Sequence, residues 1–153
     1  MKNKCCIGVD VGGTKISGAL ITPQGKILIR VKIPSPKKAQ AKEVTNAIAC
    51  VIKEILKKAH SRKIAVGGIG IGVPGIVDGA RKKIINTPNL RLSGVSLAAI
   101  IQKKFKTKVL LENDVNLGTL GEKTFGVAKR AHNVIGLFPG TGIGGGVIIN
   151  DKL

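Results

Sequence analysis

The sequence predicts an α/β fold. Short runs rich in Ile and Val, bounded by glycine or proline, alternate with segments whose apolar residues recur at helical spacing. Hydrophobic residues make up 43% of the chain against 22% charged residues, which is enough to build a buried core. The length of 153 residues is close to one domain of about 150 residues.

The first third of the chain predicts a three-stranded meander. Strands are expected at 5–11, 15–21 and 27–33, because β-branched runs are separated there by tight-turn residues. The first turn is the pair Gly12-Gly13, and the second turn is 23–25.

A helix is predicted over residues 36–60. Ser35 is expected to cap it and Pro36 to occupy its first position, and the apolar residues that follow recur at intervals of three and four. The next apolar run, 64–73, is typical of a strand buried on both faces.

The remaining elements continue the α/β alternation. Helices are expected at 95–105 and 116–125, with a strand at 109–112 between them. Two further strands are expected at 133–138 and 147–149, on either side of a glycine-rich turn that covers 140–146.

The charge balance is strongly basic. Lys and Arg total 26 against 8 acidic residues, which gives a net charge of +18 and keeps non-specific binding to nucleic acid among the possibilities. Aromatic residues are only 2%, so a base-stacking platform is not favoured. Four basic clusters are expected to be solvated surface, with an anion-binding patch as the alternative: Lys37-Lys38, Lys57-Lys58, Arg81-Lys82-Lys83 and Lys103-Lys104.

The cysteines and the apolar runs indicate a cytoplasmic protein without a membrane segment. Cys5, Cys6 and Cys50 have no CxxC spacing, so we expect small core residues in a reducing compartment and no zinc site. The amino terminus lacks a signal-peptide core, and no run reaches the length of about 18 apolar residues that a membrane span needs.

One segment repeats. Residues 7–14 and 135–142 both predict a strand followed by a Gly/Thr turn, with a second strand after it. The first copy continues into a third strand and a helix, whereas the second stops at Leu153, so the sequence is expected to end inside a second lobe.

The segment 10–15, with the letters DVGGTK, is a candidate phosphate site. Asp10 ends a predicted buried strand and can hold Mg²⁺ through water, while the turn's N–H groups and Lys15 can hold phosphate oxygens. An ordinary hairpin turn is the alternative, because Gly-Gly is common there.

Segment 140–146 is a second candidate phosphate turn. It matches GxGxxG, as does 70–75, but the dinucleotide fingerprint requires a helix to open at the last glycine. Strand-like or turn-like residues follow both segments, so neither supports a dinucleotide site.

Polar residues follow the strand predicted at 109–112. Asp114 can accept a proton from a substrate hydroxyl and Asn113 can hydrogen-bond that substrate, although helix capping by Asp114 or Asn116 explains the same residues. Asn89 in 88–90 is open to the same two interpretations, a turn or a substrate contact.

Taken together, the ordered segments DVGGTK, GIGVPGIVD, TPNL, ENDVN and GTGIGGG resemble the ROK family of bacterial sugar kinases and repressors. The resemblance covers residues 5–150 and implies a ribonuclease H-like lobe of the actin-like ATPase fold, with a mixed sheet and flanking helices. That lobe is duplicated across an ATP cleft in the family, which agrees with the repeat.

The resemblance also assigns roles to residues. It implies a glucokinase-like enzyme that transfers the terminal phosphate of MgATP to a hexose hydroxyl, with the glucose 6-hydroxyl as the expected acceptor and Asp114 as general base. Sugar contacts are implied for Gly75, Asn89, Asn113 and Asp114. Nucleotide contacts are implied for Asp10, Gly12, Gly13, Thr14 and Lys15 and for Gly140, Thr141, Gly142 and Gly144.

The match implies an incomplete architecture. We expect an amino-terminal lobe at 1–130 and the first strands of a second lobe at 131–153, with little kinase activity from the chain alone. An apolar face left between the lobes would favour self-association. The family's repressors carry a DNA-binding module before the first strand, and because that strand is expected to begin at about residue 5, the sequence does not favour a repressor. A non-catalytic sugar-binding or regulatory protein and a basic nucleic-acid-binding protein remain the alternatives.

Overall fold

A mixed five-stranded sheet forms the centre of the computed structural model, which describes residues 4–78, 80, 83–88, 90–140 and 142–153. Its strand order is β3-β2-β1-β4-β7. The strands are β1 (Cys5–Val11), β2 (Lys15–Ile21), β3 (Ile27–Pro34), β4 (Val66–Val73) and β7 (Val109–Asn113). The predicted α/β class and the amino-terminal meander are confirmed.

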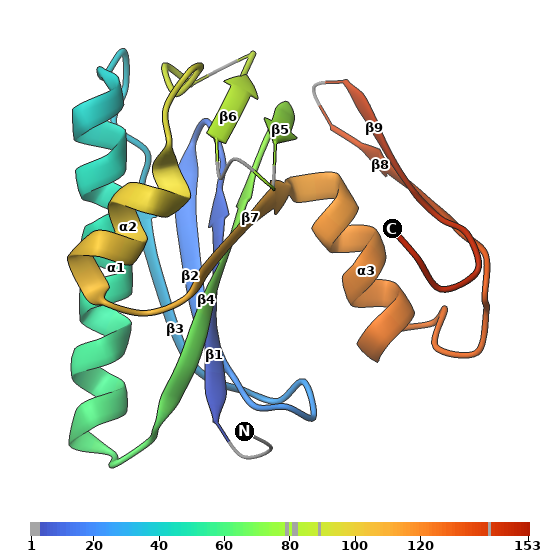
Figure 1. The fold of residues 1–153 in the computed structure, drawn as a ribbon, viewed down its shortest axis with the longest axis horizontal. Coiled ribbons are helices and arrows are strands. Elements are labelled where there is room, and N and C mark those ends of the chain that lie inside the picture. Colours follow the sequence, from blue (N-terminus) through green and yellow to red (C-terminus); the bar gives the residue numbers. More distant parts are fainter. Residues whose placement is uncertain (1–3, 79, 81–82, 89, 141) are drawn as a thin grey trace.

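The sheet combines two kinds of pairing. β1, β2 and β3 form antiparallel pairs, whereas β1 pairs with β4 and β4 with β7 in parallel. The carboxyl ends of the three parallel strands therefore lie at one edge of the sheet (Figure 1).

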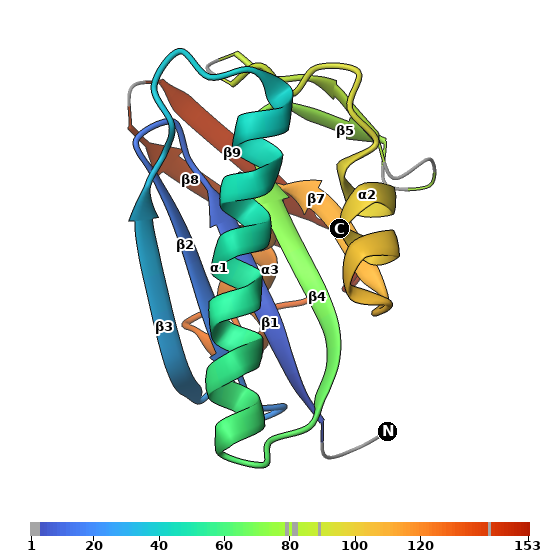
Figure 2. The same cartoon turned by 90° about the vertical axis from the view of Figure 1, so that its left-hand side faces the viewer.

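Helices cover the two faces of the sheet unequally. α1 (Ala41–Ser61) and α2 (Leu97–Phe105) lie on one face, and α3 (Asp114–Phe125) lies on the other (Figures 1 and 2). Alternation along β1 turns Ile7, Val9 and Val11 into the core. The main core therefore lies between the sheet and α1 and α2.

The helix α1 begins at Ala41, not at residue 36 as predicted. Ser35 is not its cap, because its hydroxyl donates a hydrogen bond to the Gly12 carbonyl over 2.5 Å. Gln40 is the N-cap, and its N–H donates to Glu43 Oε2 over 2.8 Å. Ser35 and Pro36 thus belong to a loop tied to the β1–β2 turn.

Two small hairpins complete the fold. β5 (Ile76–Asp78) pairs with β6 (Lys83–Asn86), and β8 (Val134–Pro139) pairs with β9 (Ile143–Ile148), both antiparallel. Most of the predicted turn 140–146 is therefore strand, because glycines 144–146 pair with β8. The two sequence repeats do form corresponding antiparallel hairpins, β1–β2 and β8–β9.

The face of the sheet that carries α3 is only partly covered. A groove of about 980 Å³ lies there, lined by the small residues of β1, β2 and β4 and closed on one side by Leu117 and Phe125 of α3. Cys6 lines it and is exposed, as is Cys50, so only Cys5 fits the expectation of buried cysteines. No helix among the described residues is long and apolar enough to cross a membrane.

Candidate functional site

The candidate site lies at the carboxyl ends of the parallel strands. Asp10 on β1 is level with Gly72 on β4, which is level with Glu112 on β7. Asp114 follows β7 directly as the first residue of α3. The sheet register thus gathers the residues that the sequence singled out separately.

Gly72 allows α3 to approach this edge. A Cβ atom at Gly72 would lie 3.5 Å from the Asp114 Cα and 3.2 Å from Leu117 Cδ1. The first turn of α3 therefore packs directly against the β4 backbone. This packing holds Asp114 over the strand that separates it from Asp10.

The charge of Asp114 influences Asp10. Partial burial raises the pKa of Asp10 above its ordinary value, the negative charge of Asp114 raises that pKa further, and the cation of Lys15 lowers it. Asp10, Asp114 and Lys15 therefore share one electrostatic environment. A cation at this position would relieve the repulsion between the two carboxylates.

The first glycine turn is fixed from outside the hairpin. The Gly12 N–H donates to the Lys15 carbonyl over 2.9 Å, and the Ser35 N–H donates to the Thr14 carbonyl over 3.0 Å. Ser35 is itself buried, and its hydroxyl donates a hydrogen bond to the Gly12 carbonyl. Gly13, Thr14 and Lys15 remain exposed at the tip, where a ligand can reach them.

Asn113 caps α3 and also contacts the loop at Gly75. It is the N-cap of α3, because its Oδ1 accepts hydrogen bonds from the N–H groups of Val115 and Asn116, each over 2.9 Å. Its Nδ2 donates to the Gly75 carbonyl over 3.0 Å. The expected caps Asp114 and Asn116 lie inside the helix, so α3 begins two residues earlier than predicted.

Gly75 needs to be a glycine. Its φ is +102°, and a Cβ there would meet the Asn86 carbonyl oxygen at about 2.1 Å. The residue therefore turns the chain from β4 toward β5 against the end of β6. Asn89, the other predicted sugar contact, lies outside the described residues.

Glu112 is a site residue for which no role was predicted from sequence. Its Oε1 accepts from the Asn113 N–H over 2.8 Å and from Asn116 Nδ2 over 3.0 Å. The bonds fix the strand-to-helix corner that carries Asp114. The spacing of four residues between Glu112 and Asn116 was the available signal.

The second glycine turn is narrower than predicted. The Gly140 N–H donates to the Gly142 carbonyl over 2.8 Å at the tip of the β8–β9 hairpin, and Thr141 lies outside the described residues. Gly144 is in β9, where a Cβ would lie 2.5 Å from Val115 Cγ2. Gly144 therefore allows β9 to pack against the first turn of α3, and both hairpin tips face the same end of the molecule (Figures 1 and 2).

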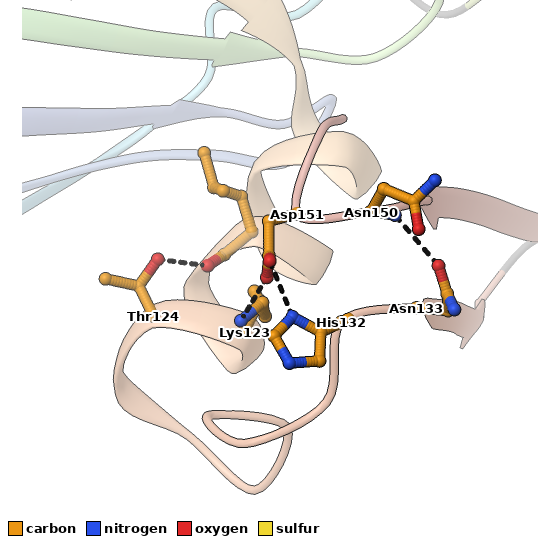
Figure 3. Close-up of polar contacts among 7 residues, drawn as sticks. Lys123, Thr124, His132, Asn133, Asn150 and Asp151 are labelled. Atoms are coloured by element: carbon orange, nitrogen blue, oxygen red, sulfur yellow. Dashed lines mark hydrogen bonds and ion pairs between the residues drawn. The ribbon is translucent and has the colours of Figure 1, made fainter.

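Polar contacts tie the other end of this hairpin to α3. Lys123 Nζ lies 2.8 Å from Asp151 Oδ1, and His132 Nδ1 lies 2.6 Å from Asp151 Oδ2 (Figure 3). Hydrogen bonds from Lys123 and then from His132 lower the pKa of Asp151. The Asn150 N–H also donates to Asn133 Oδ1 over 2.8 Å, so the hairpin is closed at its base.

No group of three or more His, Cys, Asp or Glu side chains that could hold a metal is present in the part of the chain that the structure describes. Asp10 can act as one ligand of a cation whose other ligands are waters or phosphate oxygens. Such a shell suits Mg²⁺, which keeps several waters when it binds nucleotides.

Comparisons with known proteins agree with this architecture. The ROK family model matches residues 6–153. A glucokinase of Halalkalibacterium halodurans is 32% identical over 100% of this chain and 46% of its own length. A xylose repressor of Bacillus spizizenii is 39% identical over 96% of this chain and 38% of its own length.

A solved structure shows the same fold. The ROK family glucokinase from Streptomyces griseus, in complex with glucose and AMPPNP, superposes with a TM-score of 0.86 and 34% identity over 97% of this chain. The fold is thus that of the ROK sugar kinases within the actin-like ATPases. This chain belongs to the ROK family. It spans less than half the length of these relatives.

Proposed function

We propose that the chain forms the sugar-binding and catalytic-base half of a ROK sugar kinase that phosphorylates a glucose-like hexose with ATP. The observation that carries the proposal is the pair Asp10 and Asp114, held on either side of Gly72 at the carboxyl edge of the sheet. Protein kinases divide the work in this way, with one carboxylate toward the metal and another toward the attacking hydroxyl. The solved relative with glucose and AMPPNP supports this choice of ligands.

In this proposal Asp114 accepts the proton of the sugar hydroxyl as the hydroxyl attacks the terminal phosphate. The acceptor is the 6-hydroxyl if the sugar is glucose. Gly75, Asn89 and Asn113 contact the sugar. Asn113 Oδ1 is occupied by the cap bonds of α3, so its Nδ2 is the atom that can still donate to a sugar oxygen beside the Gly75 carbonyl.

The nucleotide phosphates are assigned to the two hairpin tips. Asp10 would hold Mg²⁺ through water, and the exposed residues Gly13, Thr14 and Lys15 would donate to phosphate oxygens. Gly12 would shape this turn through the hydrogen bond from its N–H to the Lys15 carbonyl. The metal would neutralise the charge of the phosphates, and the chain's own role is to position them. In the second tip we assign Gly140, Thr141 and Gly142, with Gly144 supporting it through the packing on Val115.

The proposed architecture divides at residues 130 and 131. Residues 1–130 would form the first lobe, and the β8–β9 hairpin would open the second. Residues 1–153 match only 46% of the Halalkalibacterium halodurans and Streptomyces griseus glucokinases. Because lobe closure around the nucleotide contributes to turnover, we expect these residues by themselves to turn over slowly at most.

The Asp114→Asn variant tests the assignment. We expect any ATP-dependent glucose phosphorylation to fall by about 10²–10⁴-fold, since this is the range that general-base catalysis contributes. The measurement is a coupled assay for ADP, with glucose binding followed by ¹H–¹⁵N spectra so that a slow enzyme is still informative. Glu54→Gln, an exposed change on α1, is the control. The proposal would be overturned by an active Asp114→Asn variant, or by wild-type ¹H–¹⁵N spectra that do not change when glucose is added.

The xylose repressor relative favours a second candidate function. Its 39% identity supports a regulatory protein in which the same corner binds sugar without phosphate transfer. Sugar binding without any effect of AMPPNP would indicate this function.

A basic nucleic-acid-binding protein is the third candidate, for which the charge of +18 is the only support. Steeply salt-dependent DNA binding without a response to sugar would indicate it.

A further inference from the structure

A second cavity lies away from the aspartate pair. It has a volume of about 700 Å³ and lies between the loop that leads into α1 and the segment that joins β6 to α2. Pro36, Lys38 and Val44 line one side of it, and Thr87, Arg91 and Ser93 line the other. A volume of this size can hold a small organic ligand.

The charges around the cavity have one sign. Lys38 and Arg91 face it from opposite sides, and none of the described residues that line it is acidic. Both cations are exposed, and neither is engaged in an ion pair among the described residues. Glu43, near the start of α1, is occupied by the Gln40 N–H. The cavity is therefore cationic and open to solvent.

One wall of the cavity is held by polar contacts around the buried Thr87. Thr87 is only 6% exposed, and its hydroxyl donates to the Leu90 carbonyl. Its N–H donates to Ser93 Oγ over 3.1 Å, and that hydroxyl donates to Asn86 Oδ1 over 3.2 Å. The backbone that carries Arg91 is therefore fixed on both sides before any ligand binds.

We propose that this cavity binds a small anion that carries a phosphate group. The guanidinium of Arg91 can take two phosphate oxygens at once, and Lys38 supplies a second, point-like cation on the other wall. Free phosphate and a sugar phosphate share this chemistry, and the apolar rings of Pro36 and Pro88 can contact the carbon skeleton of the sugar phosphate. The proposal stands whether or not the chain transfers phosphate.

The position of the cavity lets a bound anion connect two parts of the proposed site, and this part rests on the proposed function. Pro36 follows Ser35, which holds the carbonyl of Gly12 in the first glycine turn. Thr87 follows Asn86, whose carbonyl is packed against Gly75. An anion that joins Lys38 to Arg91 would therefore link the loop behind the phosphate turn to the loop behind the sugar site.

The test is a titration of the ¹⁵N-labelled chain with inorganic phosphate at low ionic strength, followed by ¹H–¹⁵N spectra. We expect shifts at residues 36–39 and 90–93, and a loss of apparent affinity of about tenfold or more in Lys38→Ala/Arg91→Ala, because a charged hydrogen-bond donor is removed from each wall. The matched control is Lys53→Ala/Lys57→Ala, which removes two exposed charges from α1 and should change the affinity less than about twofold.

The outcomes separate the possibilities. Equal weakening in both double variants, or shifts spread over all basic surfaces, would overturn the proposal in favour of general attraction to a basic protein. A parallel titration with glucose 6-phosphate distinguishes the two sources, because tighter binding than phosphate with the same dependence on Lys38 and Arg91 identifies the sugar ester. Asp114→Asn should bind phosphate here like the wild type, so failure of the kinase assignment leaves this test intact.

Discussion

Ionised Asp10 lowers the stability of the folded chain when no cation is bound beside it. Burial and Asp114 both raise its pKa, so the folded state holds the Asp10 proton more tightly than the unfolded state does. Stability linked to Asp10 therefore increases as pH falls from above the raised pKa toward the ordinary value of 3.8. At neutral pH the ionised carboxylate destabilises the fold, as is common for groups kept for binding.

Asp10→Asn should therefore raise the melting temperature at pH 7. Because Asp10 is partly exposed and screened, we expect only about 1–2 °C, measured by calorimetry. The gain should disappear below pH 3.8, where the carboxyl group is neutral in both states. Lys53→Gln, a change at an exposed position of α1, serves as the control. A lower melting temperature for Asp10→Asn at pH 7 would show that Asp10 stabilises the fold.

Gly75 illustrates a residue fixed by its backbone. Gly75→Ala places a methyl group against the Asn86 carbonyl at a φ of +102°, so we expect a loss of about 3 kcal/mol in the free energy of unfolding. Gly94→Ala is the matched control, because Gly94 also has a positive φ, of +80°, but nothing lies within 4 Å of its Cβ position. Its loss should be near 1 kcal/mol. Urea unfolding measures both, and equal losses would contradict the steric argument.

At the scale of elements, the packing of the β8–β9 hairpin on α3 depends on missing side chains. Gly144→Ala would bring a methyl group within 2.5 Å of Val115 Cγ2. We expect the hairpin to separate from the first turn of α3, at a cost of about 1–3 kcal/mol. Faster amide hydrogen exchange in residues 143–148 would report this change.

A rescue and a control make the hairpin experiment specific. Val115→Ala in the same chain should restore much of the protection, because it removes the atoms that the new methyl group meets. Gly145→Ala lies in the same strand with only the Gly136 carbonyl at 3.9 Å, so it should have little effect. Equal exchange in Gly144→Ala and Gly145→Ala would mean that the close contact does not hold the hairpin.

The elements also show what sequence can and cannot predict here. Strands such as β1 and β4 follow from local apolar runs, and the position of Asp10 and Asp114 at strand ends follows with them. The start of α1 does not, because Ser35 has the local features of a cap but satisfies a carbonyl from another part of the chain. The first residues of β9 also depend on a distant partner, because their pairing with β8 overrides the turn preference of glycine.

At the scale of the whole molecule, charge and apolar surface oppose each other. The net charge of +18 repels copies of the chain, while the groove beside α3 exposes Leu110 to 63%. Because salt shortens the range of the repulsion and leaves the apolar contact unaffected, we predict that a second copy of the chain associates through this face as ionic strength rises.

Sedimentation velocity at about 10 mM and about 300 mM NaCl tests this prediction, since the Debye length falls from about 30 Å to below 8 Å over that range. We expect a monomer at low salt and a dimer or larger species at high salt. Leu110→Lys should abolish the association, because it replaces an exposed apolar side chain of the groove with a charged one. Ile100→Lys, a change at a 45% exposed residue of α2 on the other side of the sheet, should not. A sedimentation mass that does not change with salt would exclude the predicted association. A Leu110→Lys variant that still associates would show that the contact lies on another face.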